Sequence, residues 1–159
     1  MILPAVHYPT FFVSLILAFV GSIALFPATW VEWRPEWVGL MVFYWVFRAP
    51  FRFGIFFAAF VGLLLDVLEG TTLGINALSM AVIAFLVLSA HQRLRMFPIP
   101  QQSLMVFLLL GINQMIVHFI KQVLGDTDSG FDYLLPAVTS AVLWPPVCLL
   151  LDLLNRKLR

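Results

Sequence analysis

The chain has 159 residues, of which 62% are hydrophobic and 11% are charged, and its mean hydropathy is +1.02. A soluble domain is roughly 45–50% apolar and 25% charged, so this composition excludes an ordinary soluble protein and indicates a membrane protein. The net charge of +1 argues against a nucleic-acid partner.

The apolar residues occur in blocks long enough to cross a membrane as helices, which takes about 17–25 residues each. None of these blocks has the two-residue alternation of an outer-membrane barrel. We therefore predict an all-α, polytopic membrane protein in which residues 1–159 form one integral membrane domain, a bundle of six transmembrane helices. The predicted spans are residues 10–27, 36–50, 52–69, 73–90, 102–121 and 133–153.

The first predicted span begins near Thr10, with no Lys or Arg before it and no cleavage-like site after it, so it is expected to be an uncleaved helix. The second span is the weakest, because its uninterrupted apolar part from Trp37 to Phe47 is short for a crossing. A hairpin with the third span, turning at residues 48–52, explains this region better than one very long helix.

Asp66 lies among leucines, about one helical turn from the outer end of the third span. At the C-terminal end of its own helix a carboxylate opposes the helix dipole, and its side chain is too short to reach water, so Asp66 needs a partner. Two interpretations are open: a structural carboxylate hydrogen-bonded to the turn at 71–74 or to the next helix, or a contact with a partner helix or a ligand. A catalytic role is disfavoured because no second carboxylate is expected at this depth.

Three glycines accompany Asp66, namely Gly62, Gly70 and Gly74. Small residues at four-residue intervals allow helices to approach closely in a membrane. The narrow face that they form is expected either to pack within the bundle or to serve as a groove for a helix of a partner protein.

The fourth and fifth spans add polar residues at a similar depth. Asn76 lies just inside the fourth span, and Gln114, His118 and Gln122 follow one stripe of the fifth. Together with Asp66 they are expected to form an outer-leaflet cluster, which serves either as hydrogen-bonded packing or as a pocket for a ligand or lipid headgroup. One histidine among amides lacks metal-ligand spacing, so no metal site is predicted.

The sixth span contains Pro145 and Pro146 near its middle. Two prolines remove two backbone donors, so a kink or a local break is predicted there. Towards the end of this span Asp152 and Arg156 are four residues apart and are expected to pair at the surface. Cys148 is the only cysteine, which excludes an intramolecular disulfide.

Basic residues are concentrated on alternate connections of the six-span plan. Because cytoplasmic loops retain Lys and Arg, both termini are predicted to be cytoplasmic. The cytoplasmic basic residues, which are expected to fix the topology and to touch anionic lipids, are Arg48, Arg52, Arg93, Arg95, Arg156, Lys157 and Arg159. The acidic residues predicted to lie in loops on the opposite side are Glu32, Glu36, Glu69, Asp126, Asp128 and Asp132.

An ordered series of motifs runs from Arg34 to the last span. It comprises RPEW at 34–37, YW at 44–45, Pro50, GLLLD at 62–66, Gly70, LG at 73–74, QQ at 101–102 and VLWPP at 142–146. The order and spacing resemble the MreD family of bacterial rod-shape-determining proteins over most of the chain. Asn76 and His118 match no position of the family pattern, so the roles expected of them rest on this sequence alone.

The resemblance implies an inner-membrane protein that has no catalytic activity and binds no cofactor. It implies that this protein binds MreC and joins the actin-like MreB filament to the enzymes that build the lateral cell wall. It also implies a fold similar to the six-helix S-components of energy-coupling-factor vitamin transporters.

Two classes of function are therefore compared. The leading prediction is a non-enzymatic scaffold that binds MreC within the membrane, and the alternative is a small-molecule or lipid-binding membrane protein resembling a transporter S-component. A ligand-binding subunit needs a cavity of about 300–1,000 Å³, whereas a scaffold should have a filled or laterally open interior. An enzyme of the lipoprotein signal-peptidase kind is disfavoured, because the Asn- and Asp-containing motifs of that family are absent.

Overall fold

The computed structural model describes residues 8–24, 29, 33–125, 130 and 132–157. Within these ranges it is all-helical, which confirms the predicted class. The helices are α1 (Tyr8–Ala24), α2 (Trp37–Arg48), α3 (Ile55–Glu69), α4 (Ile75–Leu94), α5 (Ile99–Val123) and α6 (Leu135–Lys157), with a short 3-10 helix at Asp132–Leu134. Glu32, Asp126, Asp128 and Arg159, to which the sequence assigned a side of the membrane, lie outside the described residues, as does the side chain of Lys157.

In the part of the chain that the structure describes, three segments are long and apolar enough to cross a membrane: Ile75–Leu94, Ile99–Val123 and Asp132–Arg156. The α1 and α2 helices are apolar but shorter. With 12 residues, α2 is about 18 Å long, against a hydrocarbon core of about 30 Å. The six predicted helices are thus confirmed, while the crossing of the membrane by every one of them stays a prediction.

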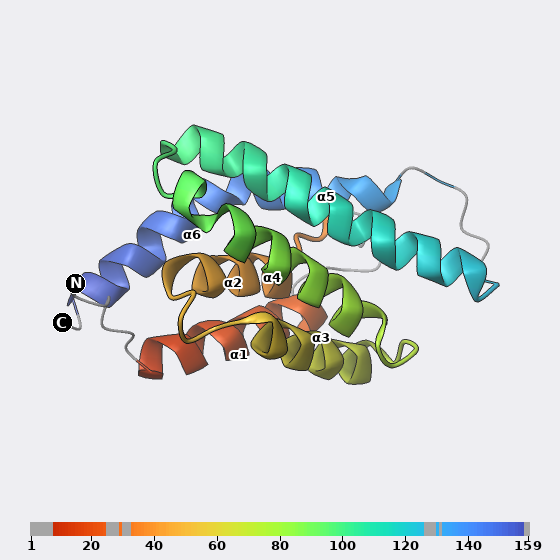
Figure 1. Ribbon diagram of the computed structural model, residues 1–159. Coiled ribbons are helices and arrows are strands. Elements are labelled where there is room, and N and C mark those ends of the chain that lie inside the picture. Colours follow the sequence, from red (N-terminus) through yellow and green to blue (C-terminus); the bar gives the residue numbers. More distant parts are fainter. Residues whose placement is uncertain (1–7, 25–28, 30–32, 126–129, 131, 158–159) are drawn as a thin grey trace.

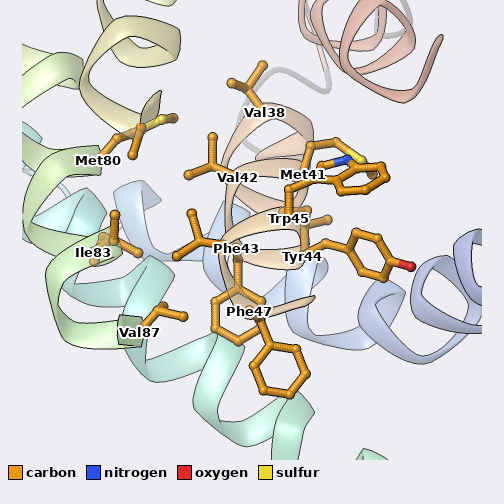
Figure 2. Packing of buried hydrophobic residues seen from close by; sticks show 14 of the residues in the cluster. Val38, Met41, Val42, Phe43, Tyr44, Trp45, Phe47, Met80, Ile83 and Val87 are labelled. Carbon is orange, nitrogen blue, oxygen red and sulfur yellow. The ribbon is translucent and has the colours of Figure 1, made fainter. Parts of the chain in front are cut away.

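The α2 helix lies at the centre of the bundle, surrounded by the other helices (Figure 1). Every residue from 38 to 47 is buried. A helix that is apolar all around can be buried on every side, so the sequence of α2 explains its central position. In Figure 2, Met80, Ile83 and Val87 of α4 line one side of α2, while Tyr44 and Trp45 extend from the opposite side.

Aromatic rings fix the neighbours of α2. Trp45 packs edge-on against Phe11 of α1, with the ring centroids 5.3 Å apart, and Phe43 packs edge-on against Trp144 of α6 at 4.9 Å. Such pairs contribute about 0.5–1.5 kcal/mol beyond the burial of their area. The first and last helices of the chain are therefore both held against α2.

The start of α1 and the end of α6 lie at one end of the bundle, and the α3–α4 turn lies at the other (Figure 1). At the first of these ends, an Arg52 guanidinium nitrogen donates to the hydroxyl of Tyr8 at 2.9 Å. This arrangement places Arg52 beside the first turn of α1, as expected if basic connections and termini share one side.

The α6 helix continues through Pro145 and Pro146, so the predicted local break does not occur. Its axis changes direction along its length (Figure 1), which is how a helix accommodates internal prolines without breaking. The predicted pairing of Asp152 with Arg156 is wrong: Asp152 forms an ion pair with Arg48 instead. The i,i+4 pattern within α6 missed this partner because it comes from another helix.

Candidate functional site

Asp66 is fully buried at the C-terminal end of α3, and its carboxylate accepts hydrogen bonds from the turn and helix that follow. Its donors are the Thr71 hydroxyl (3.1 Å), the backbone N–H groups of Gly74 (2.9 Å), Asn76 (3.1 Å) and Ala77 (3.4 Å), and the Asn76 side-chain amide (3.0 Å). The structural interpretation of Asp66 therefore matches the observed geometry.

The Asp66 carboxylate acts as the N-terminal cap of α4. The capping position of that helix is Gly74, which has no side chain to offer. A carboxylate at a helix N-terminus satisfies free N–H groups and faces the positive end of the helix dipole. The unfavourable position at the end of α3 is thus offset by a favourable one at the start of α4.

The three glycines near Asp66 serve two different purposes. A methyl group on Gly62 would lie only 2.5 Å from the Asn76 carbonyl oxygen and 2.7 Å from Ala77 backbone atoms, so α3 and α4 touch at this point. Gly70 and Gly74 instead have φ angles of 65° and 103°, in the region that glycine adopts most readily. The common narrow face expected of the three is therefore not formed, and the groove at Gly62 is filled by α4.

A second polar cluster surrounds Glu36, at the start of α2. Its carboxylate accepts hydrogen bonds from the Asn113 amide, at 3.1 and 3.2 Å, and from the Gln114 amide of the same helix. Its backbone N–H donates to the Ser140 hydroxyl of α6 at 2.9 Å. Glu36 thus joins α2, α5 and α6.

Glu36 was predicted to lie in a loop on the side opposite the basic residues and was not singled out as a site residue. Asn113, which is only 2% exposed, was a candidate polar partner on the fifth span but was not placed on the stripe of Gln114, His118 and Gln122. The available signal was the position of Glu36 directly before Trp37, at the start of an apolar helix. Only the tertiary fold shows that this start lies inside the bundle.

One cavity of about 190 Å³ lies between the two clusters. Glu36, Asn76, Asn113 and Gln114 line it together with Glu69, which forms an ion pair with Arg34 at 3.2 Å. The two side chains of that pair are 29% and 31% exposed, so the cavity reaches the surface beside them. Asn76 and Gln114, predicted to share a cluster with Asp66, therefore do share one polar region.

His118 does not join this region. Its ring stacks on Tyr133 with the centroids 4.2 Å apart, and it forms a hydrogen bond with Gln122 at 3.1 Å. His118 is one turn beyond Gln114 on α5, but it is held against the 3-10 helix instead of lining the cavity.

At the opposite end, Asp152 joins α2 to α6. It accepts from Tyr44 at 2.8 Å and pairs with Arg48, while the Asn155 amide donates to the Tyr44 hydroxyl at 3.1 Å. Arg48, predicted to be a topology-fixing residue, is therefore also part of a contact between helices.

The outer surface of the bundle is apolar. Among the described residues, exposed large hydrophobic side chains occur on α3, α5 and α6, for example Phe56 (92%), Phe119 (67%) and Val142 (72%). No group of three metal-binding side chains is found in the described part of the chain. An apolar exterior around hydrogen-bonded polar side chains defines an all-helical membrane protein whose polar interior joins its helices.

Comparison with known sequences gives the family. The family described as rod shape-determining protein MreD matches residues 4–154. Over 144 residues the chain is 29% identical to the Rod shape-determining protein MreD of Haemophilus influenzae, covering 91% of this chain and 89% of that protein. The chain belongs to the MreD family, so it has a role in rod-shape determination. No solved structure gives a significant match.

Proposed function

We propose that this protein is a non-enzymatic scaffold of the bacterial cell-elongation complex, located in the inner membrane with both termini in the cytoplasm. In this proposal the whole chain is one integral membrane domain that binds MreC. Through MreC it supports the connection between MreB filaments and the enzymes of lateral wall synthesis. Membership of the MreD family supports this role.

One observation favours a scaffold over a transporter-like subunit: polar side chains inside the bundle form hydrogen-bonded clusters that join its helices. Asp66 accepts five hydrogen bonds within the α3–α4 hairpin, counting from the donors Thr71, Gly74, Asn76 (twice) and Ala77. The cavity of about 190 Å³ is smaller than the roughly 300–1,000 Å³ of a drug-sized or vitamin-sized site. The polar side chains of the interior thus serve mainly to join helices.

The surface available to a partner helix is the apolar exterior. On α3 the exposed side chains of Phe56, Phe60, Leu63 and Val67 recur at intervals of three and four residues and therefore form one stripe. The segment from residue 62 to 76 remains a candidate contact only through its outward-facing side chains, because Gly62 is covered by α4.

Co-purification with a candidate MreC tests the proposal. Photo-crosslinking residues at positions 60, 119 and 142 sample three exposed helices, and a crosslinker at the buried position 84 is the control. We expect co-purification and crosslinks from at least one exposed position. Failure of the two proteins to co-purify from membranes in which both are folded would refute the MreC-binding role.

The orientation is tested separately. Fluorescent or protease-sensitive tags at either terminus are expected to report the cytoplasm. A periplasmic signal from either tag would contradict the proposed six-span topology, whatever the outcome with MreC.

A further inference from the structure

The cavity beside Glu36 contains more hydrogen-bond acceptors than its described donors satisfy. The Glu36 carboxylate receives hydrogen bonds from two neutral amides, and no Lys or Arg among the described residues forms an ion pair with it. Asn113, which also lines the cavity, has a buried Oδ1 atom without a hydrogen-bond partner in the described part of the chain. Within the described residues, the Glu36 carboxylate therefore lacks a paired cation, and the Asn113 Oδ1 atom lacks a hydrogen-bond donor.

The orientation of the Asn113 amide is set by its neighbour. Its nitrogen lies 3.1 and 3.2 Å from the two Glu36 carboxylate oxygens. Rotating the amide by half a turn would place its oxygen against the carboxylate, exchanging two attractive contacts for repulsive ones. The unpaired Oδ1 atom is thus a real acceptor, and burying an acceptor without a donor is unfavourable.

A ligand that satisfies this site needs a positive charge and several N–H donors. A primary ammonium group has three donors and no acceptor, so it can bind the Glu36 carboxylate from the cavity, and its positive charge is favourable near the unpaired Asn113 oxygen. Glu69 offers a further acceptor on the same wall, because within the described residues its Oε2 atom makes a single long contact, 3.5 Å from the Asn76 amide.

The size of the cavity and its other lining residues further restrict which ligands can fit. A volume of about 190 Å³ corresponds to roughly six water molecules. A cavity of this size admits a compact polar group but not a vitamin. Arg34 and Lys121 line the same cavity and suit a phosphate group. Both signs of charge are thus present around one small space that reaches the surface.

We propose that this cavity binds a phosphoethanolamine group, with the ammonium on the Glu36 carboxylate, beside Asn113, and the phosphate towards Arg34 and Lys121. The group can come from a phosphatidylethanolamine of the surrounding bilayer or from soluble phosphoethanolamine. The inference goes beyond the scaffold role and does not depend on MreC. Water alone in the cavity is the competing occupant.

Native mass spectrometry of the delipidated full chain tests the proposal. The probes are dioleoyl phosphatidylethanolamine and dioleoyl phosphatidylcholine, which have the same acyl chains, but the choline headgroup has no N–H donors. We expect the ethanolamine lipid to bind at least about tenfold more tightly, the effect of losing hydrogen bonds to a charged group. Equal binding of the two lipids would overturn the proposal.

Two variants target the site by different routes. Glu36→Gln removes the charge and keeps the shape, and Gly39→Ala adds a methyl group 2.9 Å from the Glu36 Oε2 atom, at the ends of flexible side chains. Both should abolish most of the headgroup preference, and Gly39→Ala remains informative if Glu36→Gln does not fold. The matched controls are Asp132→Asn, which removes an exposed charge, and Gly111→Ala, where a methyl group meets nothing within 4 Å.

A preference for phosphatidylethanolamine that survives in both site variants would overturn the assignment to this cavity. Competition with soluble phosphoethanolamine then identifies the source. Displacement of the lipid shows that the headgroup alone is recognised, and a lack of displacement shows that the bilayer lipid is the ligand; both results support the proposed chemistry.

Discussion

Two polar networks near one cavity are built from opposite kinds of contact. Asp66 is hydrogen-bonded to residues five to eleven positions further along the chain. Glu36 is bound to residues 77, 78 and 104 positions away. The first network belongs to a single hairpin, and the second exists only when three helices have packed.

This difference separates two steps in building the bundle. The Asp66 network closes α3 and starts α4, since the Asp66 carbonyl also accepts the Thr71 N–H at 3.1 Å. It can therefore form as soon as the hairpin does. The Glu36 network holds α2, α5 and α6 in position and depends on their prior packing. Loss of the local network should accordingly be the more damaging of the two.

The largest effect is expected for Asp66→Ala. The substitution leaves a helix N-terminus without its cap and several buried donors without an acceptor, so we expect a loss of about 3 kcal/mol in the free energy of unfolding. Thermal and denaturant unfolding in detergent measure it. Glu69→Ala, at a side chain that is 29% exposed, is the matched control and should cost far less.

Association with MreC should follow the same order, because a disordered α3–α4 hairpin alters the surface offered to a partner. If Asp66→Ala and Glu69→Ala were tolerated equally in both unfolding and pull-down experiments, Asp66 would have no special role and the contrast between the networks would be lost.

Gly62→Ala tests whether close packing of the hairpin is needed for the local network. The new methyl group would lie 2.5–2.7 Å from the α4 backbone, which cannot move as a side-chain end can. Overpacking of this kind costs typically 1–3 kcal/mol, and we expect about 2 kcal/mol. In Gly111→Ala the methyl group enters open space, so an equal loss there would contradict this explanation.

Ser140→Ala removes one contact of the non-local network. The fully buried Ser140 hydroxyl is the acceptor for the Glu36 N–H, at 2.9 Å. We expect a loss of about 1 kcal/mol, as for a typical buried hydrogen bond. Thr139→Ala is the control, since among the described residues the Thr139 hydroxyl bonds to carbonyls of its own helix alone. A loss as large as that of Asp66→Ala would contradict the ranking of the networks.

The sequence predicted the helical class, the six helices and the need of Asp66 for a partner, because these depend on local composition and spacing. The turn at residues 71–74 was a correct candidate for that partner for the same reason. Glu36 and Asp152 were misjudged, since their partners lie on helices far away in the chain. Helical periodicity places residues on one face of one helix, but it does not state which helix packs there.

The smallest effect is expected at the opposite end of the bundle, for Tyr44→Phe. The Tyr44 hydroxyl donates to Asp152 at 2.8 Å, so this network is also non-local, but Asp152 keeps its ion pair with Arg48 when the hydroxyl is removed. The Asp152 side chain is 31% exposed, so water can replace the lost donor. Hydrogen bonds between helices in membranes average about 0.6 kcal/mol, and we expect a loss of that size in denaturant unfolding.

Asp152→Asn removes the ion pair as well and should cost more. If Tyr44→Phe were the more damaging of the two, the hydroxyl and not the ion pair would join α2 to α6, and sequence distance alone would not decide how much a network contributes.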